Sequence, residues 1–518
     1  MNEIMARTLS FGVSGVEGFP VRVEVFGLNG LPGMEIIGLP DTSVRESKDR
    51  VNAAIINCGR QMHPRRITIN LAPADQKKEG PAFDLPIAIG VMIASGELIP
   101  TEEHPTDEIA MFGELSLDGH LQPVSGVLPM VISAKEYGVH KVIVPSGNAR
   151  EVACIEDMTI YPAEHLCEVI DHLEGRKTLI PQKQISYDNL ISVNRCSVNM
   201  SQIKGQKAAR RALEVAAAGG HNLLMVGVPG SGKTMLARAL PGILPPLSFA
   251  ESLETTRIHS ICGKLPADSG LMVERPFSAP HHSTSVASLI GGGSNARPGE
   301  VSLAHNGVLF LDELPEFSRS ALEALRQPLE DGIVSVSRIK KQAQYQSSFM
   351  LVAAMNPCPC GYYGSSRRSC RCTTQEIKRY LDRVSGPLLD RIDIQIEVDA
   401  VPVSEINEQQ AAESSEEVCA RVTEARRIQL ERYSGKPYHC NAQLDSAGIR
   451  SFCRMSGEAE TLLRAAMDSL HMSMRAYNRI LKVARTIADL DNQPLIEMTH
   501  MAEAIQYREL DQKYWSNK

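Results

Sequence analysis

A glycine-rich loop is the part of this sequence whose residue types and spacing indicate chemistry most directly. It follows an apolar run at 221–226, precedes a helical pattern at 235–240, and reads Gly227-Val228-Pro229-Gly230-Ser231-Gly232-Lys233-Thr234. Glycines let backbone N–H groups converge on phosphate oxygens, where a Cβ would obstruct them. In such a loop Lys233 reaches the β- and γ-phosphates, and the Thr234 hydroxyl binds Mg²⁺. The strand–loop–helix context favours a nucleoside triphosphate site over a simple glycine turn.

An acidic pair ends a second apolar run. Residues 307–311 are apolar throughout, as expected of a parallel strand covered on both faces, and Asp312 and Glu313 follow. Asp312 is predicted to help hold Mg²⁺, and Glu313 to polarise the water that attacks the γ-phosphate. Acidic turns after strands are common, but the position downstream of the glycine loop favours a functional pair.

Two further elements follow in the order that such a site needs. The strand-like run 348–355 ends at Asn356, whose amide can orient the same water and sense the γ-phosphate. Arg391 then lies between Asp390 and Asp393 on an apolar segment. An arginine in that position is either a structural ion pair or an arginine finger that enters a neighbouring subunit's site.

These elements, in this order, resemble the AAA+ ATPases. The resemblance implies binding of ATP with Mg²⁺, hydrolysis of that ATP, and an Arg391 finger that acts in trans. It also implies a second sensor on a helical lid, for which Arg475 is the candidate and Arg479, one turn further on, is the rival. The alternative is that Arg475 has no such role and lies on a solvated face of its helix.

The sequence between the glycine loop and the acidic pair restricts the resemblance to one branch of the AAA+ ATPases. Its segments are 276–283, 291–293, 297–300 and 302–307. They are similar to the magnesium-chelatase-like branch of AAA+, above all to the ComM/YifB family, over essentially the whole chain. This implies a homo-oligomeric ring, expected to be hexameric, with an insertion around 265–300 that reaches the ring axis. Adjacent side chains point apart, so we expect a structural or substrate-contact role for His281 and His282 rather than metal binding.

A basic hairpin is predicted just before the sensor strand. Residues 332–337 alternate as a strand, a cationic turn that includes Lys340 and Lys341 follows, and 342–348 lead into the run that ends at Asn356. In a ring this hairpin would project into the channel, where the two lysines would meet DNA phosphates. The alternative is an ordinary solvated basic turn.

Four of the twelve cysteines lie in two Cys-x-Cys pairs on one short loop: Cys358, Cys360, Cys370 and Cys372. Four thiolates suit tetrahedral Zn²⁺ in a closed, structural site. The spacing is tighter than the usual Cys-x₂-Cys, so free thiols and a redox pair remain alternatives.

The amino-terminal part resembles a proteolytic domain that has lost its chemistry. Residues 67–145 are similar to the protease domain of Lon and to the related domain of the RadA/Sms proteins. Lon-like enzymes use a Ser nucleophile and a Lys base, whereas Ala82 and Leu128 occupy those positions here. Without either group a Ser-Lys mechanism has no chemistry. We therefore expect an assembly or DNA-contact platform, with Lys77 and Lys78 as its exposed cations unless they belong to an ordinary solvated loop.

Composition and pattern predict a multidomain α/β protein. The chain has 518 residues, 43% hydrophobic and 22% charged, with a net charge of −7 that gives no global sign of nucleic-acid binding. Without a membrane span or leader, a reducing, cytoplasmic location is expected. The expected regions are an α+β Lon-protease-like domain (1–175) with strands at 21–25 and 67–71, a linker (176–200), an AAA+ P-loop α/β core with pore insertions (201–398) and a helical lid (399–518). The clearest helices expected in the lid are 414–430 and 458–470.

The resemblance implies a ring-forming ATPase that acts as a motor on single-stranded or branched DNA. Its expected activities are helicase action and branch migration, which integrate DNA in natural transformation. The alternative is a chelatase-type motor that remodels a protein partner without nucleic acid. Two other interpretations are an ATP-dependent protease, which Ala82 and Leu128 oppose, and an ATPase that only switches its assembly state.

Overall fold

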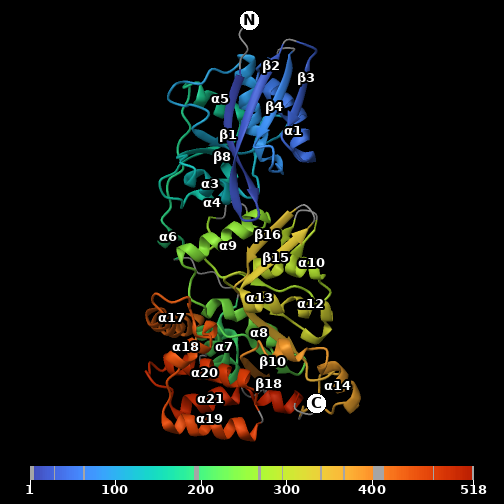
Figure 1. Ribbon diagram of the computed structural model, residues 1–518, viewed down its shortest axis with the longest axis vertical. Coiled ribbons are helices and arrows are strands. Elements are labelled where there is room, and N and C mark those ends of the chain that lie inside the picture. Colours follow the sequence, from blue (N-terminus) through green and yellow to red (C-terminus); the bar gives the residue numbers. More distant parts are fainter. Residues whose placement is uncertain are drawn as a thin grey trace. The chain divides into compact units, whose positions relative to one another are not determined.

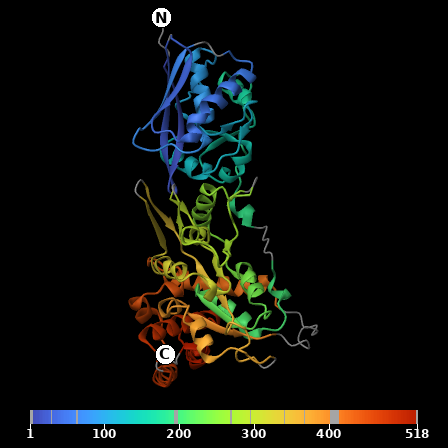
Figure 2. The same cartoon turned by 90° about the vertical axis from the view of Figure 1, so that its right-hand side faces the viewer.

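The computed structural model forms two compact units (Figures 1 and 2). The first comprises residues 1–193 with 248–273, and the second comprises 194–247 with 274–518. The structure describes residues 5–28, 30–61, 65–191, 198–266, 270–293, 296–338, 341–365, 368–400, 413–470 and 472–515. Among these residues, no helix combines the length and the apolar character that crossing a membrane requires.

A seven-stranded mixed sheet organises the first unit. β1 pairs antiparallel with β2, and β2 with β4, while the remaining neighbours run parallel. In sheet order the strands are β3 (Gly33–Ile37), β4 (Arg66–Ala72), β2 (Glu17–Leu28), β1 (Met5–Ser14), β5 (Ile109–Met111), β8 (Lys141–Pro145) and β9 (Thr159–Ala163). A short ribbon, β6 (Glu114–Leu115) with β7 (Leu121–Gln122), lies beside it. The predicted strands 21–25 and 67–71 are confirmed, within β2 and β4.

Helices cover both faces of this sheet. Successive side chains of a strand point to opposite faces, and in β1 Ala6 belongs to one hydrophobic core whereas Leu9 and Phe11 belong to another. The helices are α1 (Thr42–Asn57), α2 (Asp84–Ser95), α3 (Val127–Glu136), α4 (Ala149–Val152), α5 (Leu166–Leu173), α6 (Tyr187–Ile191) and α9 (Phe249–Ile261). α9 interrupts the sequence of the second unit but belongs to the first. The Gly126 N–H at the start of α3 donates to the Ser260 carbonyl of α9 at 3.1 Å.

The positions of the protease nucleophile and base hold core residues. Ala82 and Leu128 are both buried. Lys78, expected as an exposed cation, is fully buried, and its ammonium donates to the carbonyls of Pro73 and Gln76. That expectation is wrong, since a lysine enclosed by carbonyls has no surface to offer DNA. Lys77 is exposed, as expected.

A five-stranded parallel sheet forms the centre of the second unit. Its order is β11 (Phe277–Ser278), β14 (Val308–Leu311), β17 (Met350–Met355), β10 (Leu223–Gly227) and β18 (Ile394–Val398). Every residue of β10, β14 and β17 is buried, as the continuous apolar runs predict. Parallel strands present their carboxyl ends at one edge, which brings the segments that follow these three strands together.

Helices complete the second unit, and those near the chain's end gather in red in Figure 1. Around the sheet are α7 (Lys207–Gly219), α8 (Lys233–Ala239), α10 (Val286–Ile290), α11 (Glu300–Leu303), α12 (Arg319–Ala324), α13 (Arg326–Asp331), α14 (Thr374–Leu381) and α15 (Gly386–Leu389). The later helices are α17 (Ser415–Arg432), α18 (Ser446–Phe452), α19 (Gly457–Ser469), α20 (Met474–Leu490) and α21 (Met498–Gln506). α17 and α19 confirm the helices predicted at 414–430 and 458–470. Both α17 and α20 pack against α7 and share one core with the sheet.

The predicted hairpin is present. β15 (Ile333–Arg338) pairs antiparallel with β16 (Lys341–Gln346), and a second ribbon joins β12 (Gly291–Gly292) to β13 (Arg297–Pro298). Lys340 lies outside the described residues, and only the backbone of Lys341 is described.

Candidate active site and metal centre

Lys233 joins the glycine loop to the sensor strand. It is the first residue of α8, and its ammonium donates to the carbonyls of Gly227 at 2.8 Å and Val228 at 3.0 Å. It also donates to Oδ1 of Asn356 at 3.3 Å, across 123 positions of sequence. Burial lowers the pKa of Lys233, against the opposing charge of Asp312. The predicted phosphate-binding lysine and the predicted sensor therefore meet at one point.

Glycines are required at three positions of the loop. A Cβ on Gly227 would lie 2.2 Å from the Val398 carbonyl oxygen of the neighbouring strand β18. Gly230 and Gly232 have φ of 76° and 91°, in the left-handed region that favours glycine. The loop therefore keeps its form only with glycine at these positions.

Gln206 is a residue of this site that sequence reasoning missed. Its side-chain amide donates to the Ser231 carbonyl at 3.3 Å and to the Asp399 carbonyl. It thus ties the glycine loop to the end of β18. Its left-handed backbone, with φ of 53°, has no pattern in the sequence that could have predicted it.

Thr234 and Asp312 lie together, as their predicted role in holding Mg²⁺ requires. The Thr234 hydroxyl donates to Oδ2 of Asp312 at 2.9 Å, and Oδ1 accepts the backbone N–H of Glu313 at 2.9 Å. Hydroxyl and carboxylate oxygens are ligands that Mg²⁺ prefers, so the pair fits this cation. When bound, Mg²⁺ would neutralise charge on the phosphates.

Glu313 has a partner that was not expected. Its carboxylate is half exposed, and Oε2 lies 3.3 Å from Nδ1 of His282. The rings of His281 and His282 have centroids 4.0 Å apart, so the expectation that the two side chains point apart is wrong. His282 follows β11, the neighbour of β14, and the rule that strand ends share an edge is the signal that would have placed it here.

Arg391 and Arg475 lie near one another but have different partners. Arg475 is 70% exposed and donates to Oδ2 of Asp390 at 2.9 Å. Arg391 is 12% exposed, pairs with Glu330 of α13 and donates to the Pro387 carbonyl at 2.5 Å. Burial lowers the pKa of Arg391, as do nearby arginines including Arg475. Among the described residues, neither has a hydrogen bond or ion pair with the glycine loop.

Arg479, the rival for the second-sensor role, is largely buried and forms an ion pair inside its own subunit. It is 13% exposed, and its Nε lies 3.5 Å from Oδ1 of Asp393. Asp393 is also 3.2 Å from Nδ1 of His221, just before β10. The exposed guanidinium on this helix is therefore that of Arg475.

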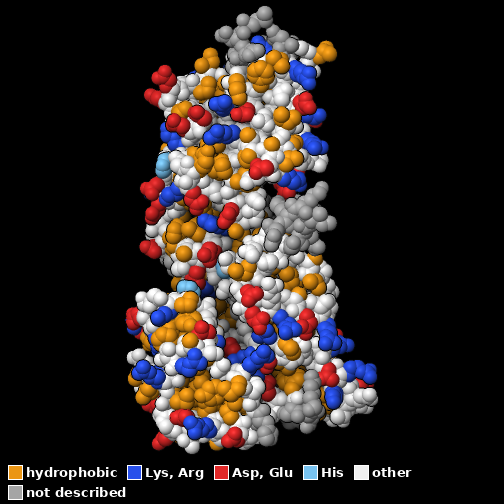
Figure 3. Space-filling model, in the orientation of Figure 1, with side chains coloured by type: hydrophobic (Ala, Val, Ile, Leu, Met, Phe, Trp, Pro, Cys, Tyr) orange, Lys and Arg blue, Asp and Glu red, His pale blue; other side chains and the backbone are white. Residues whose placement is uncertain are grey.

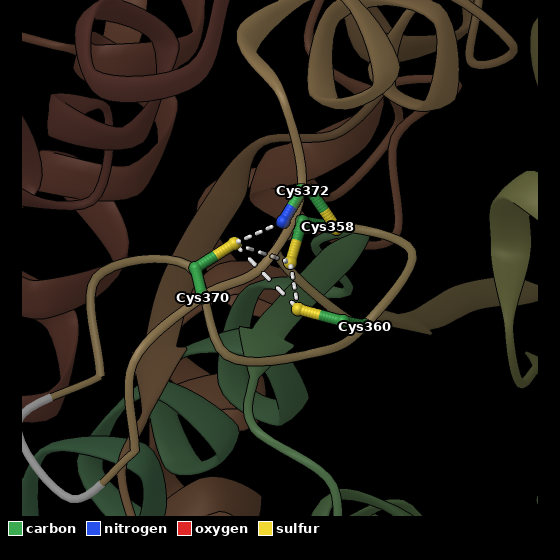
Figure 4. A group of neighbouring side chains, drawn as sticks. All are labelled: Cys358, Cys360, Cys370 and Cys372. Atoms are coloured by element: carbon green, nitrogen blue, oxygen red, sulfur yellow. Dashed lines mark hydrogen bonds between the residues drawn. The ribbon is translucent and has the colours of Figure 1, made fainter.

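The four cysteines of the predicted zinc loop converge (Figure 4). Their four sulfurs lie within 4.8 Å of one another. Cys358 Sγ is 3.4 Å from that of Cys360 and 3.6 Å from that of Cys370, and the latter two are 3.6 Å apart. Zn–S bonds of about 2.3 Å put tetrahedral sulfurs roughly 3.8 Å apart, so the group fits zinc. The backbone N–H of Arg371 lowers the pKa of Cys360 to about 6, which favours the thiolate that binds metal.

The cysteine loop packs against the glycine loop. Gly361 has φ of 83°, and a Cβ there would lie 2.6 Å from Cγ of Pro229 and 3.8 Å from Cγ of Asn356. Only a residue without a side chain allows this approach. The cysteine loop therefore supports both the glycine loop and the sensor residue.

The described surface in view mixes acidic and basic side chains (Figure 3). This agrees with the net charge of −7. A nucleic-acid contact would have to come from a local element such as the hairpin.

Comparisons with known proteins match three successive parts of the chain to the same family. Family models described as subunit ChlI of Mg-chelatase, magnesium chelatase subunit ChlI, and its C-terminal part match residues 23–148, 199–406 and 412–508. The protein YifB of Escherichia coli is 44% identical over 96% of both chains. Competence protein ComM of Haemophilus influenzae is 43% identical over 95% of both. An archaeal Lon protease of Methanothermobacter thermautotrophicus is 34% identical over 111 residues, 20% of this chain and 17% of its own. The chain therefore belongs to the ComM/YifB family of magnesium-chelatase-like AAA+ ATPases, with a Lon-protease-like amino-terminal domain.

Proposed function

We propose that the chain is one subunit of a hexameric ATPase ring that moves on single-stranded or branched DNA. The observation that carries the proposal is the continuity between hairpin and nucleotide site. β16 ends at Gln346 and β17 begins at Met350, and β17 leads to Asn356, which contacts Lys233. A change at the γ-phosphate can therefore reach the hairpin through one strand. The relative named as a competence protein supports a role in natural transformation, through helicase and branch-migration activity.

The base of the hairpin is held by its neighbours. Cγ2 of Val336 lies 3.2 Å from where a Cβ of Gly291 would be, and the Tyr345 hydroxyl donates to the Ala296 carbonyl at 2.7 Å. Just before β17, the Ser348 N–H donates to Nδ1 of His305 at 3.1 Å. These contacts support a hairpin that moves together with the 291–298 ribbon and the sensor strand.

Hydrolysis is assigned to two sets of groups. Within one subunit, Glu313 polarises the attacking water, Asn356 orients it and Lys233 holds the phosphates. Arg391 and Arg475 act together on the neighbouring subunit's ATP, because they lie near one another and, among the described residues, have no hydrogen bond or ion pair with their own glycine loop.

We expect the cysteine cluster to hold a structural zinc ion that supports the nucleotide site. Purified protein should contain about one Zn²⁺ in this cluster, because four converging thiolates form a closed site. Cys358→Ser with Cys372→Ser should release one equivalent and weaken ATP binding, since Gly361 of the same loop supports Pro229. Metal analysis and nucleotide titration check this. Cys419→Ser, a partly buried thiol elsewhere in the second unit, is the control. A cluster that holds no metal in protein prepared without chelator would contradict the site.

DNA contact by the hairpin tip is the second expectation. Lys340→Ala with Lys341→Ala should weaken single-strand binding and make log K less steep against log salt, by about 0.7 for each phosphate that the variant no longer neutralises. Basal ATPase should persist, because the described contacts of the nucleotide site join Lys233 to Asn356 and Thr234 to Asp312. Lys177→Ala with Lys183→Ala removes the same charge from exposed positions of the first unit and should leave the slope unchanged. Equal slopes in both double variants would exclude the tip as a DNA contact.

The alternative to a DNA motor is a chelatase-type motor that remodels a protein partner. The match to magnesium chelatase subunit ChlI is the observation that supports this second candidate. The ATPase rate with and without single-stranded and branched DNA separates the two. Stimulation by DNA supports the DNA motor. A rate that is indifferent to both forms, with no measurable DNA binding, would assign the chain to a protein substrate.

A further inference from the structure

A second cluster of metal-ligating side chains lies in the first unit. Cys58 caps the carboxyl end of α1, His165 caps the amino end of α5, and Cys167 is the second residue of α5. One ligand atom from each lies within 4.8 Å of the others, and all three side chains are partly buried. Residues 107 positions apart in sequence thus meet at the junction of two helices.

The contacts of His165 determine its tautomer. Nε2 lies 3.0 Å from the Asp118 carbonyl, which can only accept, so Nε2 carries the proton. Nδ1 accepts the backbone N–H of Cys167 at 3.1 Å and therefore carries a lone pair. Cys58 Sγ is 4.0 Å from this Nδ1. An imidazole that donates one N–H to a carbonyl can bind a metal through its other nitrogen, and here a cation would take the Nδ1 lone pair in place of the Cys167 N–H.

The loop that orients the histidine is itself fixed. Gly119 has φ of 92°, and a Cβ there would lie 2.8 Å from Cε1 of His165 and 3.3 Å from Sγ of Cys58. The Gly119 carbonyl accepts the Leu166 N–H at 2.8 Å, and His120 forms a β-bridge with His165. The Asp118 carbonyl is therefore held against the ring before any cation arrives.

We propose that Cys58, His165 and Cys167 form a second metal site, which binds Zn²⁺ or a cation of similar softness. Two thiolates and one imidazole are a donor set that zinc takes, with a fourth position left for water or another donor. Binding forms two sulfur–metal bonds and one nitrogen–metal bond, breaks the hydrogen bond from the Cys167 N–H to Nδ1, and releases the two thiol protons to solvent. The cation would join the end of α1 to the start of α5. This site is independent of the ATPase function and of the four-cysteine cluster.

Cobalt titration of the full chain tests the site. The background is Cys358→Ser, Cys360→Ser, Cys370→Ser and Cys372→Ser together, in which the other cluster keeps no thiol. We expect one Co²⁺ per chain with a thiolate-to-cobalt band roughly half as strong as that of a four-thiolate site, since it has two thiolates. Zn²⁺ should displace the cobalt. In the otherwise unsubstituted chain, Cys58→Ser should lower the zinc content by one equivalent.

Ligand variants make the result specific. His165→Asn keeps a favoured helix cap for α5 but removes the imidazole, and should weaken Co²⁺ binding more than about 100-fold, beyond the loss of an outer-sphere partner. Cys167→Ser should do the same, while Cys262→Ser, a partly buried thiol at the end of α9, should have no effect. Cobalt bands of equal strength in all three variants overturn the proposal. So does peptide mapping that finds Cys58 joined to Cys167 by a disulfide in protein purified with reductant.

Discussion

Glu313→Gln is expected to lower ATP turnover about 10²–10⁴-fold while ATP still binds. An amide has the shape of the carboxylate but cannot take a proton from the attacking water, and general-base catalysis contributes on that scale. The hydrogen bond between Thr234 and Asp312 should persist, and Asp312 also accepts the backbone N–H of residue 313, which glutamine retains. Steady-state hydrolysis and equilibrium binding of a fluorescent ATP analogue measure the two effects separately.

Glu316→Gln is the matched control for this change. Glu316 follows three residues later, and its exposed carboxylate pairs with Arg383 at 2.8 Å. Its loss should leave turnover close to normal, because surface ion pairs contribute little. Normal turnover in Glu313→Gln would remove Glu313 from the mechanism, and equal losses in both variants would point to a general structural effect.

Arg391→Ala is expected to lower hydrolysis at least about 10³-fold, the lower limit for loss of an arginine finger. The same change breaks the ion pair with Glu330, so Glu330→Ala is the control, which breaks the pair and keeps the guanidinium. A finger predicts that only Arg391→Ala is inactive. A purely structural pair predicts that the two variants lose activity and thermal stability to a similar extent.

Mixed rings test whether the arginine acts in trans. Arg391→Ala has an intact glycine loop, and Lys233→Ala has an intact finger, so a mixed interface can combine the functional half of each. Partial recovery of hydrolysis on mixing is therefore expected. No recovery, in mixed rings shown by mass spectrometry to have formed, would favour the interpretation of Arg391 as a structural partner of Glu330.

Much of the fold of the second unit could be predicted from local sequence. Residues 223–226, 308–311 and 350–355 are apolar throughout because buried parallel strands face core on both sides, and all three segments are strands in the structure. Helices α17 and α19 were predicted from their periodicity. The hairpin was predicted as well, because its alternation and turn are local features.

Local pattern was misleading where burial and contacts depend on how the chain folds, within one loop or between distant segments. Lys78 looks like a surface cation in sequence, yet carbonyls of its own loop enclose it. His282 looks like half of an inert pair, yet it contacts Glu313 because β11 lies next to β14. Residues 248–273 sit within the sequence of the ATPase core, yet they belong to the first unit, where α9 packs on α3.

The sequence by itself determined which reactive groups this protein carries: a lysine after a glycine-rich loop at Lys233, an acidic pair at Asp312 and Glu313, and four thiols on one loop. These follow from residue type and short spacing, which the chain carries locally. Only the tertiary structure decided which groups meet. The contact of Lys233 with Asn356, and the meeting of Cys58 with His165, join residues more than 100 positions apart. Such contacts depend on strand order and helix packing, which no short stretch of sequence contains.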